Sequence, residues 1–195
     1  MEARTFNLAA AALGVVLFAA LGVAAYRSNA PESPSIQPEA VPATMKLQVF
    51  FSNPKLAPKG ATDCSLVYPV ERTLPRDANV SRVALLELFK GPSADEAAQG
   101  FTSPFSDATR DMLVSVRVDR ATAYVDFKDF RKMLPNASSA CGGLQFRSQV
   151  EATLQQFPVI GKVIYAIGKI PQTFYEFMQL GCDWKTTTCD GANFP

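Results

Sequence analysis

Two aspartates near the middle of the chain, Asp126 and Asp129, have the spacing most suited to chemistry. They flank Phe127-Lys128 at the end of a predicted strand. Paired carboxylates can act as general acid and general base, or as nucleophile, in the hydrolysis of a glycosidic bond. The same residues would also serve as a helix cap and a solvated strand end, and this structural interpretation is preferred.

Glu71 and Arg72 form a second candidate, because they lie in a predicted strand beside Pro69. Side chains alternate across a strand, so the two should point to opposite faces. A guanidinium such as that of Arg72 can bind an anionic ligand, or it can form an ion pair with a neighbouring strand, which is the preferred interpretation. Glu71, Arg72 and Asp126 are therefore the candidate binding residues, and Glu71 is also a third carboxylate available to a hydrolase.

The sequence contains no histidine, and this absence excludes several mechanisms. Ser-His-Asp and Cys-His catalysis, His-liganded metal sites and an imidazole general base are all ruled out. A formal net charge of +1 lacks the basic excess of a nucleic-acid binder. No Gly-rich phosphate loop occurs, and no cofactor or metal is predicted. Because no serine or carboxylate constellation replaces histidine, we do not expect an enzyme.

Aromatic residues gather near the C-terminus, where they could form a platform for stacking on sugars. Trp184 lies close in sequence to Phe174, Tyr175 and Phe177. These side chains could equally cover one edge of the core, which is the preferred interpretation.

Four cysteines, Cys64, Cys141, Cys182 and Cys189, are an even number without CxxC spacing. Two disulfides are favoured over a four-cysteine metal site, and three pairings are possible. The favoured pairing joins Cys64 to Cys141 and Cys182 to Cys189. In the loop-entropy model the long bridge contributes about 4–5 kcal/mol and the short one about 2–3 kcal/mol.

Residues 1–27 are predicted to form a membrane anchor or a signal peptide. Leu8–Tyr26 carries no charge and would span about 28 Å as a helix, close to the thickness of a bilayer core. Its length favours a retained anchor, although Val23-Ala24-Ala25 could be a cleavage site. Residues 28–43, with four regularly spaced prolines, predict an extended linker. The rest of the chain is expected outside the cytoplasm.

Residues 44–180 predict one α+β domain, and residues 181–195 a disulfide-closed tail. We expect a mostly antiparallel sheet with two main helices packed on one face. Val114, Val116 and Val118 should share a buried face, and the last strand, apolar on both faces, should be central. The predicted strands are Met45–Phe51, Ser65–Arg72, Leu113–Asp119, Thr122–Phe127 and Val159–Ile167. The first predicted helix, Asn79–Lys90, should stop at Gly91-Pro92. A short helix with a capping box from Ser93 to Glu96 should follow to about Gln99. The last predicted helix is Gly143–Gln156, while Lys169–Leu180 is ambiguous.

Several blocks of this region resemble the GerMN domain, the sporulation and spore germination domain. They occur in the family's order and together cover about residues 45–170. The blocks are Val49–Ser52, Val67–Arg72, Ala84–Pro92, Ala123–Phe127 and Val150–Pro158. The hairpin turn departs from the family pattern, which has Gly or Asn-Gly where this chain has Asp119-Arg120. A two-residue turn with arginine at positive φ would be strained, so a longer turn is expected.

The resemblance implies a bacterial envelope domain that follows a signal or an anchor. We therefore expect a non-enzymatic domain, tethered to the cytoplasmic membrane and facing outward, or secreted if the N-terminal segment is cleaved. It would bind cell-wall polymer or an envelope protein, and no nucleic acid. Two alternatives stay open: a peptidoglycan hydrolase that uses Asp126, Asp129 or Glu71, and a structural subunit of an envelope assembly.

Overall fold

The computed structural model describes residues 43–181 and 194–195. The predictions for the N-terminal segment, the linker and the C-terminal tail fall on residues outside this part, so they stay predictions. These residues are Leu8–Tyr26, residues 28–42, Cys182, Trp184 and Cys189. No helix within the described residues is long and apolar enough to cross a bilayer. The elements are β1 Thr44–Phe51, β2 Tyr68–Pro75, α2 Val80–Leu88, α3 Ala94–Ala98, η1 Asp107–Thr109, β3 Leu113–Asp119, β4 Thr122–Phe127, η2 Pro135–Ser138, α4 Ala140–Gln155, β5 Lys162–Ile167 and α5 Pro171–Phe177.

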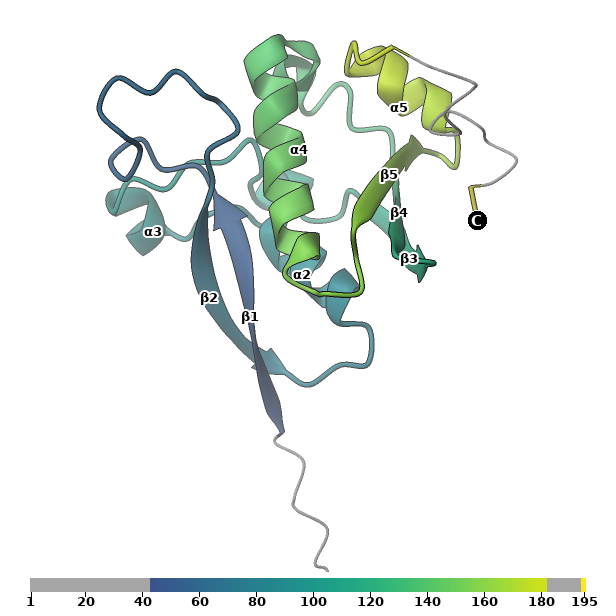
Figure 1. Cartoon of the computed structure of the whole chain (residues 1–195), viewed down its shortest axis with the longest axis horizontal. Coiled ribbons are helices and arrows are strands. Elements are labelled where there is room, and N and C mark those ends of the chain that lie inside the picture. The colour runs from purple at the N-terminus through teal and green to yellow at the C-terminus, as the bar shows by residue number, and fades with distance from the viewer. Residues whose placement is uncertain (1–42, 182–193) are drawn as a thin grey trace, which may run out of the picture. The chain divides into compact units, whose positions relative to one another are not determined.

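The strands form two separate sheets (Figure 1). β1 and β2 make an antiparallel pair, while β3, β4 and β5 make a three-stranded sheet in that order. β4 pairs antiparallel with β3 and parallel with β5. The α+β class is confirmed, but the single sheet with two helices on one face is wrong. The crossover through α4 delivers β5 parallel to β4, and β5 is an edge strand rather than the predicted central one.

Side chains of α4 cover the outer edge of β1 and so keep the two sheets apart. The Gln156 side chain, at the C-cap of α4, accepts a hydrogen bond from the Gln48 N–H at 2.8 Å and donates one to the Gln48 carbonyl at 2.6 Å. The Phe50 N–H donates to the Thr153 hydroxyl at 3.2 Å. These side chains satisfy backbone groups that a third strand would otherwise pair.

The core lies between the sheets and the helices, and it is rich in phenylalanine. α2 and α4 pack against each other, and each of them contacts a strand of both sheets. Phe127 on the central strand β4 is fully buried, and its ring contacts aromatic rings from five other positions. These rings belong to Phe89, Phe130, Phe146, Tyr165 and Phe174. One aromatic cluster therefore joins α2, β4, α4, β5 and α5.

Local hydrogen bonds explain where the observed boundaries differ from the predicted ones. β2 starts three residues later than predicted, because both the N–H and the hydroxyl of Ser65 donate to the Asp63 carboxylate and hold a turn there. α4 starts at Ala140 because the Ser139 hydroxyl accepts from the Gly142 N–H and caps the helix. The predicted capping box at Ser93 is confirmed, with Glu96 as its partner. The ambiguous segment after Lys169 contains a helix, α5.

A β-bulge between Leu113 and Ser115 changes the predicted face of β3. Leu113 and Val116 are buried, whereas Val114 and Val118 are exposed. The prediction that three valines share a buried face is therefore wrong. The bulge moves Val114 off the buried face, whereas Val118 keeps the alternation of Val116 and is exposed near the end of the strand.

The β3–β4 turn is shorter than predicted. Asp119 pairs with Thr122, so Arg120 and Ala121 alone form the turn, and their φ values are +44° and +62°. Two central residues with positive φ are typical of the type I′ turn, whose twist matches that of the flanking strands. The Ala121 carbonyl also accepts hydrogen bonds from the N–H groups of Gly161 and Lys162, at 2.8 and 3.1 Å. These bonds hold the strained turn against the start of β5.

Relieving this strain should stabilise the protein. Arg120→Asn combined with Ala121→Gly is expected to raise the free energy of unfolding by about 1 kcal/mol, because L side chains are disfavoured at positive φ. Urea denaturation measures the change. Ala97→Gly in helix α3 is the matched control, with an expected loss of about 0.5–1 kcal/mol. A loss of stability in the turn variant would contradict the prediction.

Candidate functional site

The two aspartates that could have formed a carboxylate pair lie in different environments. Asp126 is buried, with 1% of its surface exposed, and its carboxylate accepts a hydrogen bond from the Lys169 N–H at 2.8 Å. Asp129 is exposed and binds the Arg131 guanidinium, with 2.7 Å between Oδ2 and Nη2. Hydrogen bonds from Arg131 lower the pKa of Asp129 to about 2. Asp126 thus anchors the turn after β5, and Asp129 stays ionised at neutral pH.

Glu71 and Arg72 lie on opposite faces of β2, and each has an ion-pair partner. Arg72 binds the Glu96 carboxylate of α3 through both terminal nitrogens, with 2.9 Å between Nη2 and Oε2. Burial alone would raise the pKa of Glu96, but the hydrogen bonds from Arg72 and Ser93 outweigh it and the pKa is lowered. Glu71 pairs with Lys46 of β1 at 3.0 Å, on the exposed face. These contacts tie β2 to β1 and to α3.

The C-terminal aromatic residues that the structure describes belong mostly to the core. Phe174 is fully buried and stacks on Tyr165 with 4.6 Å between the ring centroids, and Tyr175 is also buried. The described aromatic residues of α5 therefore do not form an exposed platform for sugars.

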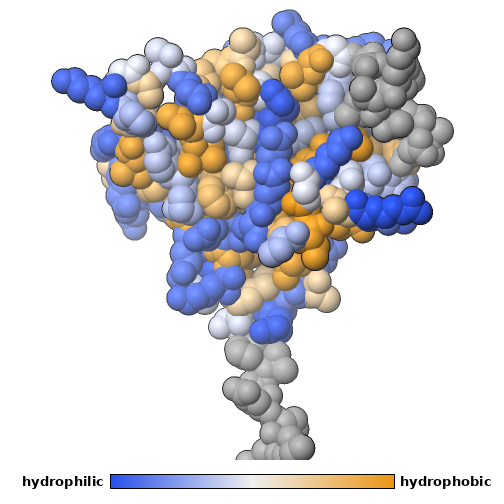
Figure 2. Space-filling view, viewed as in Figure 1, coloured by the Kyte–Doolittle hydropathy of each residue, from blue (hydrophilic) through white to orange (hydrophobic). Residues whose placement is uncertain are grey.

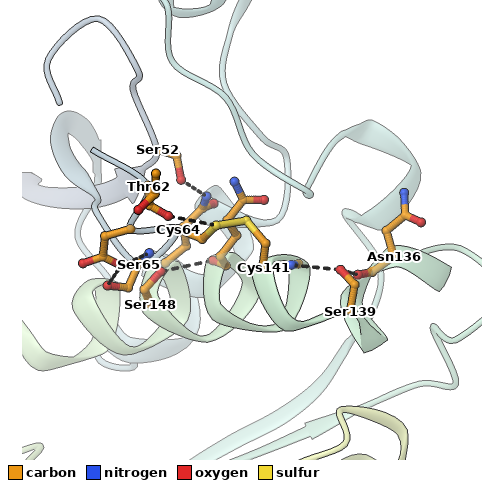
Figure 3. Close-up of a disulfide and its surroundings, with 12 residues drawn as sticks. Ser52, Thr62, Cys64, Ser65, Asn136, Ser139, Cys141 and Ser148 are labelled. Carbon is orange, nitrogen blue, oxygen red and sulfur yellow. Dashed lines mark hydrogen bonds between the residues drawn. A yellow bond between two sulfur atoms is a disulfide. The ribbon is translucent and has the colours of Figure 1, made fainter. Parts of the chain in front are cut away.

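The predicted bridge between Cys64 and Cys141 is present. It joins the long loop between β1 and β2 to the first turn of α4, and the loop with Thr62 and Ser65 lies directly beside the helix (Figure 3). Cys182 and Cys189 are the remaining two cysteines of the sequence, and their pairing stays a prediction.

Two small pockets adjoin each other beside α4, and Cys64 of the bridge lines one of them. The loop pocket, of about 180 Å³, lies between the β1–β2 loop and α4, and the turn pocket, of about 260 Å³, lies between α4 and the segments 102–104 and 133–137. Thr102 and Gln145 line both pockets and form their shared wall. The loop pocket includes Ser52, Asn53, Thr62 and Asp63, and the turn pocket includes Ser103, Met133, Leu134 and Asn136.

Four polar side chains in these pockets are available to a ligand. Within the part of the chain that the structure describes, the side chains of Thr62, Thr102, Asn136 and Gln145 have no hydrogen-bond partner. Figure 3 shows the Asn136 amide directed away from α4, while its backbone carbonyl accepts the hydrogen bond from Ser139. Hydroxyl and amide groups both donate and accept hydrogen bonds, so the pockets suit a neutral polar ligand.

The buried side-chain amide of Gln149 supports the wall that the two pockets share. Gln149 of α4 is fully buried, and its side chain donates to the Ser52 hydroxyl at 3.2 Å and accepts from the Ser103 hydroxyl at 2.6 Å. Ser52 and Thr102 also exchange two backbone hydrogen bonds. Gln149 is not among the residues that the sequence predicts to be functional. The sequence pattern that could have indicated it is the position of a polar residue on the apolar side of the helix, beside Phe146 and Val150. A polar side chain that is buried there needs a hydrogen-bond partner.

The pockets carry little charge. Asp63, on the exposed rim of the loop pocket, is the charged residue among those that line them, and hydrogen bonds from Ser65 lower its pKa. The face of the domain shown in Figure 2 mixes hydrophilic residues with small hydrophobic areas. The site therefore offers apolar surface together with neutral hydrogen-bonding groups.

Comparison with known proteins identifies a family and a set of similar structures. The Germane family, described as sporulation and spore germination, matches residues 48–167. This match confirms the resemblance seen in the sequence. A search of curated proteins finds no significant match.

Three solved structures are similar to the chain at low identity. The tandem GerMN domains of the sporulation protein GerM from Bacillus subtilis are 19% identical with a TM-score of 0.47, over 70% of this chain and 42% of that one. The first GerMN domain of the same protein is 22% identical with a TM-score of 0.40, over 63% and 82%. A putative lipoprotein from Clostridium perfringens is 17% identical with a TM-score of 0.35, over 64% and 75%. The chain thus spans 42% of the length of the tandem structure.

Proposed function

This chain belongs to the Germane family of sporulation and spore germination domains, and from that premise we propose that it is a non-enzymatic binding domain of the bacterial cell envelope. The domain is held outside the cytoplasmic membrane by residues 1–27 and the Pro-rich linker, and it binds cell-wall polymer. The observation that carries the binding proposal is the pair of adjoining pockets lined by unpartnered hydroxyl and amide groups.

The positions of the carboxylates support binding without hydrolysis. Glycosidases need two carboxyl groups that both reach the scissile bond. Asp126 is buried under the turn after β5, while Asp129 and Glu71 are engaged in ion pairs at the surface. None of the three lines the loop pocket or the turn pocket.

Cosedimentation with purified peptidoglycan sacculi tests the proposed function. The full chain in mild detergent should pellet with sacculi and should release no muropeptides. If the chain stays in the supernatant and crosslinks in cells only to an envelope protein, wall binding is wrong. Muropeptide release that Asp126→Asn abolishes would instead establish the hydrolase.

The tether has its own test. Removal of residues 1–27 should move the chain from the membrane fraction to the soluble fraction, and N-terminal sequencing of the mature protein should find residue 1 or 2 retained. A mature N-terminus near residue 26 would replace the anchor with a cleaved signal peptide.

A further inference from the structure

We propose that the loop pocket and the turn pocket together form a groove for a neutral, N-acetylated polysaccharide, with Thr102 and Gln145 between two successive sugar units. This inference rests on the proposed function, because it names the site and the ligand class through which wall polymer would be held. The residues of this groove are distinct from the candidate carboxylates and from Arg72.

The size of the pockets favours single units of a polymer. Each cavity, about 180 and about 260 Å³, is smaller than the roughly 300–1,000 Å³ of sites for drug-sized ligands. Two small pockets that share a wall suit two repeating units of a linear chain better than one compact ligand. Thr102 and Gln145, which form that wall, can donate to or accept from the linkage between the units.

The turn pocket combines the two properties that an acetamido group requires. Met133 and Leu134 provide apolar surface for the acetyl methyl group, and Met133 is 44% exposed. Asn136 and Gln145 provide unpartnered amides for the acetamido N–H and carbonyl. The loop pocket combines apolar residues such as Pro54 and Leu66 with the free hydroxyls of Thr62 and Thr102, and Asp63 lies at its rim. This mixture suits a sugar ring, which presents both C–H and hydroxyl groups.

The charge of the groove argues against a charged peptide as the ligand. A charged partner in a partly enclosed site needs opposite charges to replace its lost hydration. The lining residues offer one carboxylate, Asp63, and it lies at the exposed rim. The hydroxyls and acetamido groups of a neutral glycan match the remaining polar groups without such a cost.

The walls of the groove are held rigidly, which limits the entropy lost on binding. Gln149 binds Ser52 and Ser103 beneath the shared wall, and the Cys64–Cys141 bridge ties the loop to α4. The turn with Asn136 packs directly on Gly142, where a Cβ atom would lie 2.0 Å from the Asn136 carbonyl oxygen. Only glycine permits this approach, so the Asn136 backbone has a defined position beside the turn pocket.

Calorimetric titration of the full chain in detergent with tetra-N-acetylchitotetraose tests the inference. Cellotetraose, which has the same linkage but a hydroxyl in place of each acetamido group, should bind about tenfold more weakly, because the acetamido contacts are lost. Gln145→Glu should weaken binding of the acetylated tetramer about tenfold. Gln155→Glu is the matched control, because it makes the same change on an exposed position of the same helix and should bind as the parent does.

The outcomes separate this inference from the proposed function. Equal binding of both tetramers, or an unchanged affinity in a Gln145→Glu variant that denatures at the parent's urea midpoint, would overturn the groove. Retention on sacculi without binding of the acetylated tetramer would also overturn it, while wall binding would stand. Absence of binding to both sacculi and tetramer would overturn the two together.

Discussion

Replacing Cys64 and Cys141 with serine is expected to lower the free energy of unfolding by about 4–5 kcal/mol. The bridge closes a loop with a sequence separation of 77 residues. In the loop-entropy model, opening so long a loop releases a large conformational entropy in the unfolded chain. The loss is comparable with the whole stability of a small domain, so the variant should be largely unfolded at elevated temperature.

Urea denaturation in a background with Cys182 and Cys189 changed to serine isolates this bridge. A dithiol reductant should bring the parent to the stability of the Cys64→Ser, Cys141→Ser variant and should leave that variant unchanged. Hydrogen exchange should show faster opening of the β1–β2 loop, because that loop loses its covalent tie to α4. An unfolding midpoint that reduction does not move would show that the bridge contributes nothing.

Gln149→Ala should cost about 3 kcal/mol of stability. The substitution leaves a cavity at a fully buried position and removes the partners of the Ser52 and Ser103 hydroxyls. Because those residues hold the shared wall of the pockets, binding of the acetylated tetramer should weaken together with stability. Thermal and urea denaturation measure the first effect, and calorimetric titration measures the second.

Two further variants separate the causes of this loss. Gln149→Met nearly preserves the volume but not the hydrogen bonds, so it should keep part of the stability and still lose affinity. Gln155→Ala, on the exposed side of the same helix, should change stability by less than about 0.5 kcal/mol. A Gln149→Ala variant as stable as Gln155→Ala would contradict the supporting role of the buried amide.

The local elements were largely predictable because short-range signals determine them. β1, β3 and β4 begin and end within one residue of their predicted bounds, and α2 ends at Leu88, shortly before the Gly91-Pro92 stop that the sequence predicts. The Ser93 capping box and the pairing of Cys64 with Cys141 were also predicted and are present. In each case the signal lies in the spacing of a few residues.

The arrangement of the elements was not predictable in the same way. No local pattern shows that Gln156 and Thr153 cover the edge of β1. The sequence therefore predicts one sheet where the structure has two. The Arg120-Ala121 turn has a sequence that argues against positive φ, yet strand twist and the hydrogen bonds of its carbonyl to the chain before β5 impose it. Tertiary contacts there outweigh a local cost of a few kcal/mol.

Almost none of the candidate site could be predicted from the sequence. The residues with obvious chemistry, Asp126 and Arg72, are bound to neighbouring structural groups, whereas the unpartnered side chains are two threonines, an asparagine and a glutamine of ordinary sequence context. They come together from the loop after β1, the segments near residues 102 and 136, and helix α4.

The sequence by itself determined the α+β class, most strands and helices, the membership of the Germane family and the absence of any histidine-based mechanism. These depend on composition, periodicity and short motifs, which act over a few residues. Only the tertiary structure decided the division into two sheets, the partners of each charged residue and the two pockets beside Gln145. The physical reason is that hydrogen bonds and close packing form between segments that are far apart in the chain. Whether one polar group can be buried therefore depends on which distant group becomes its partner.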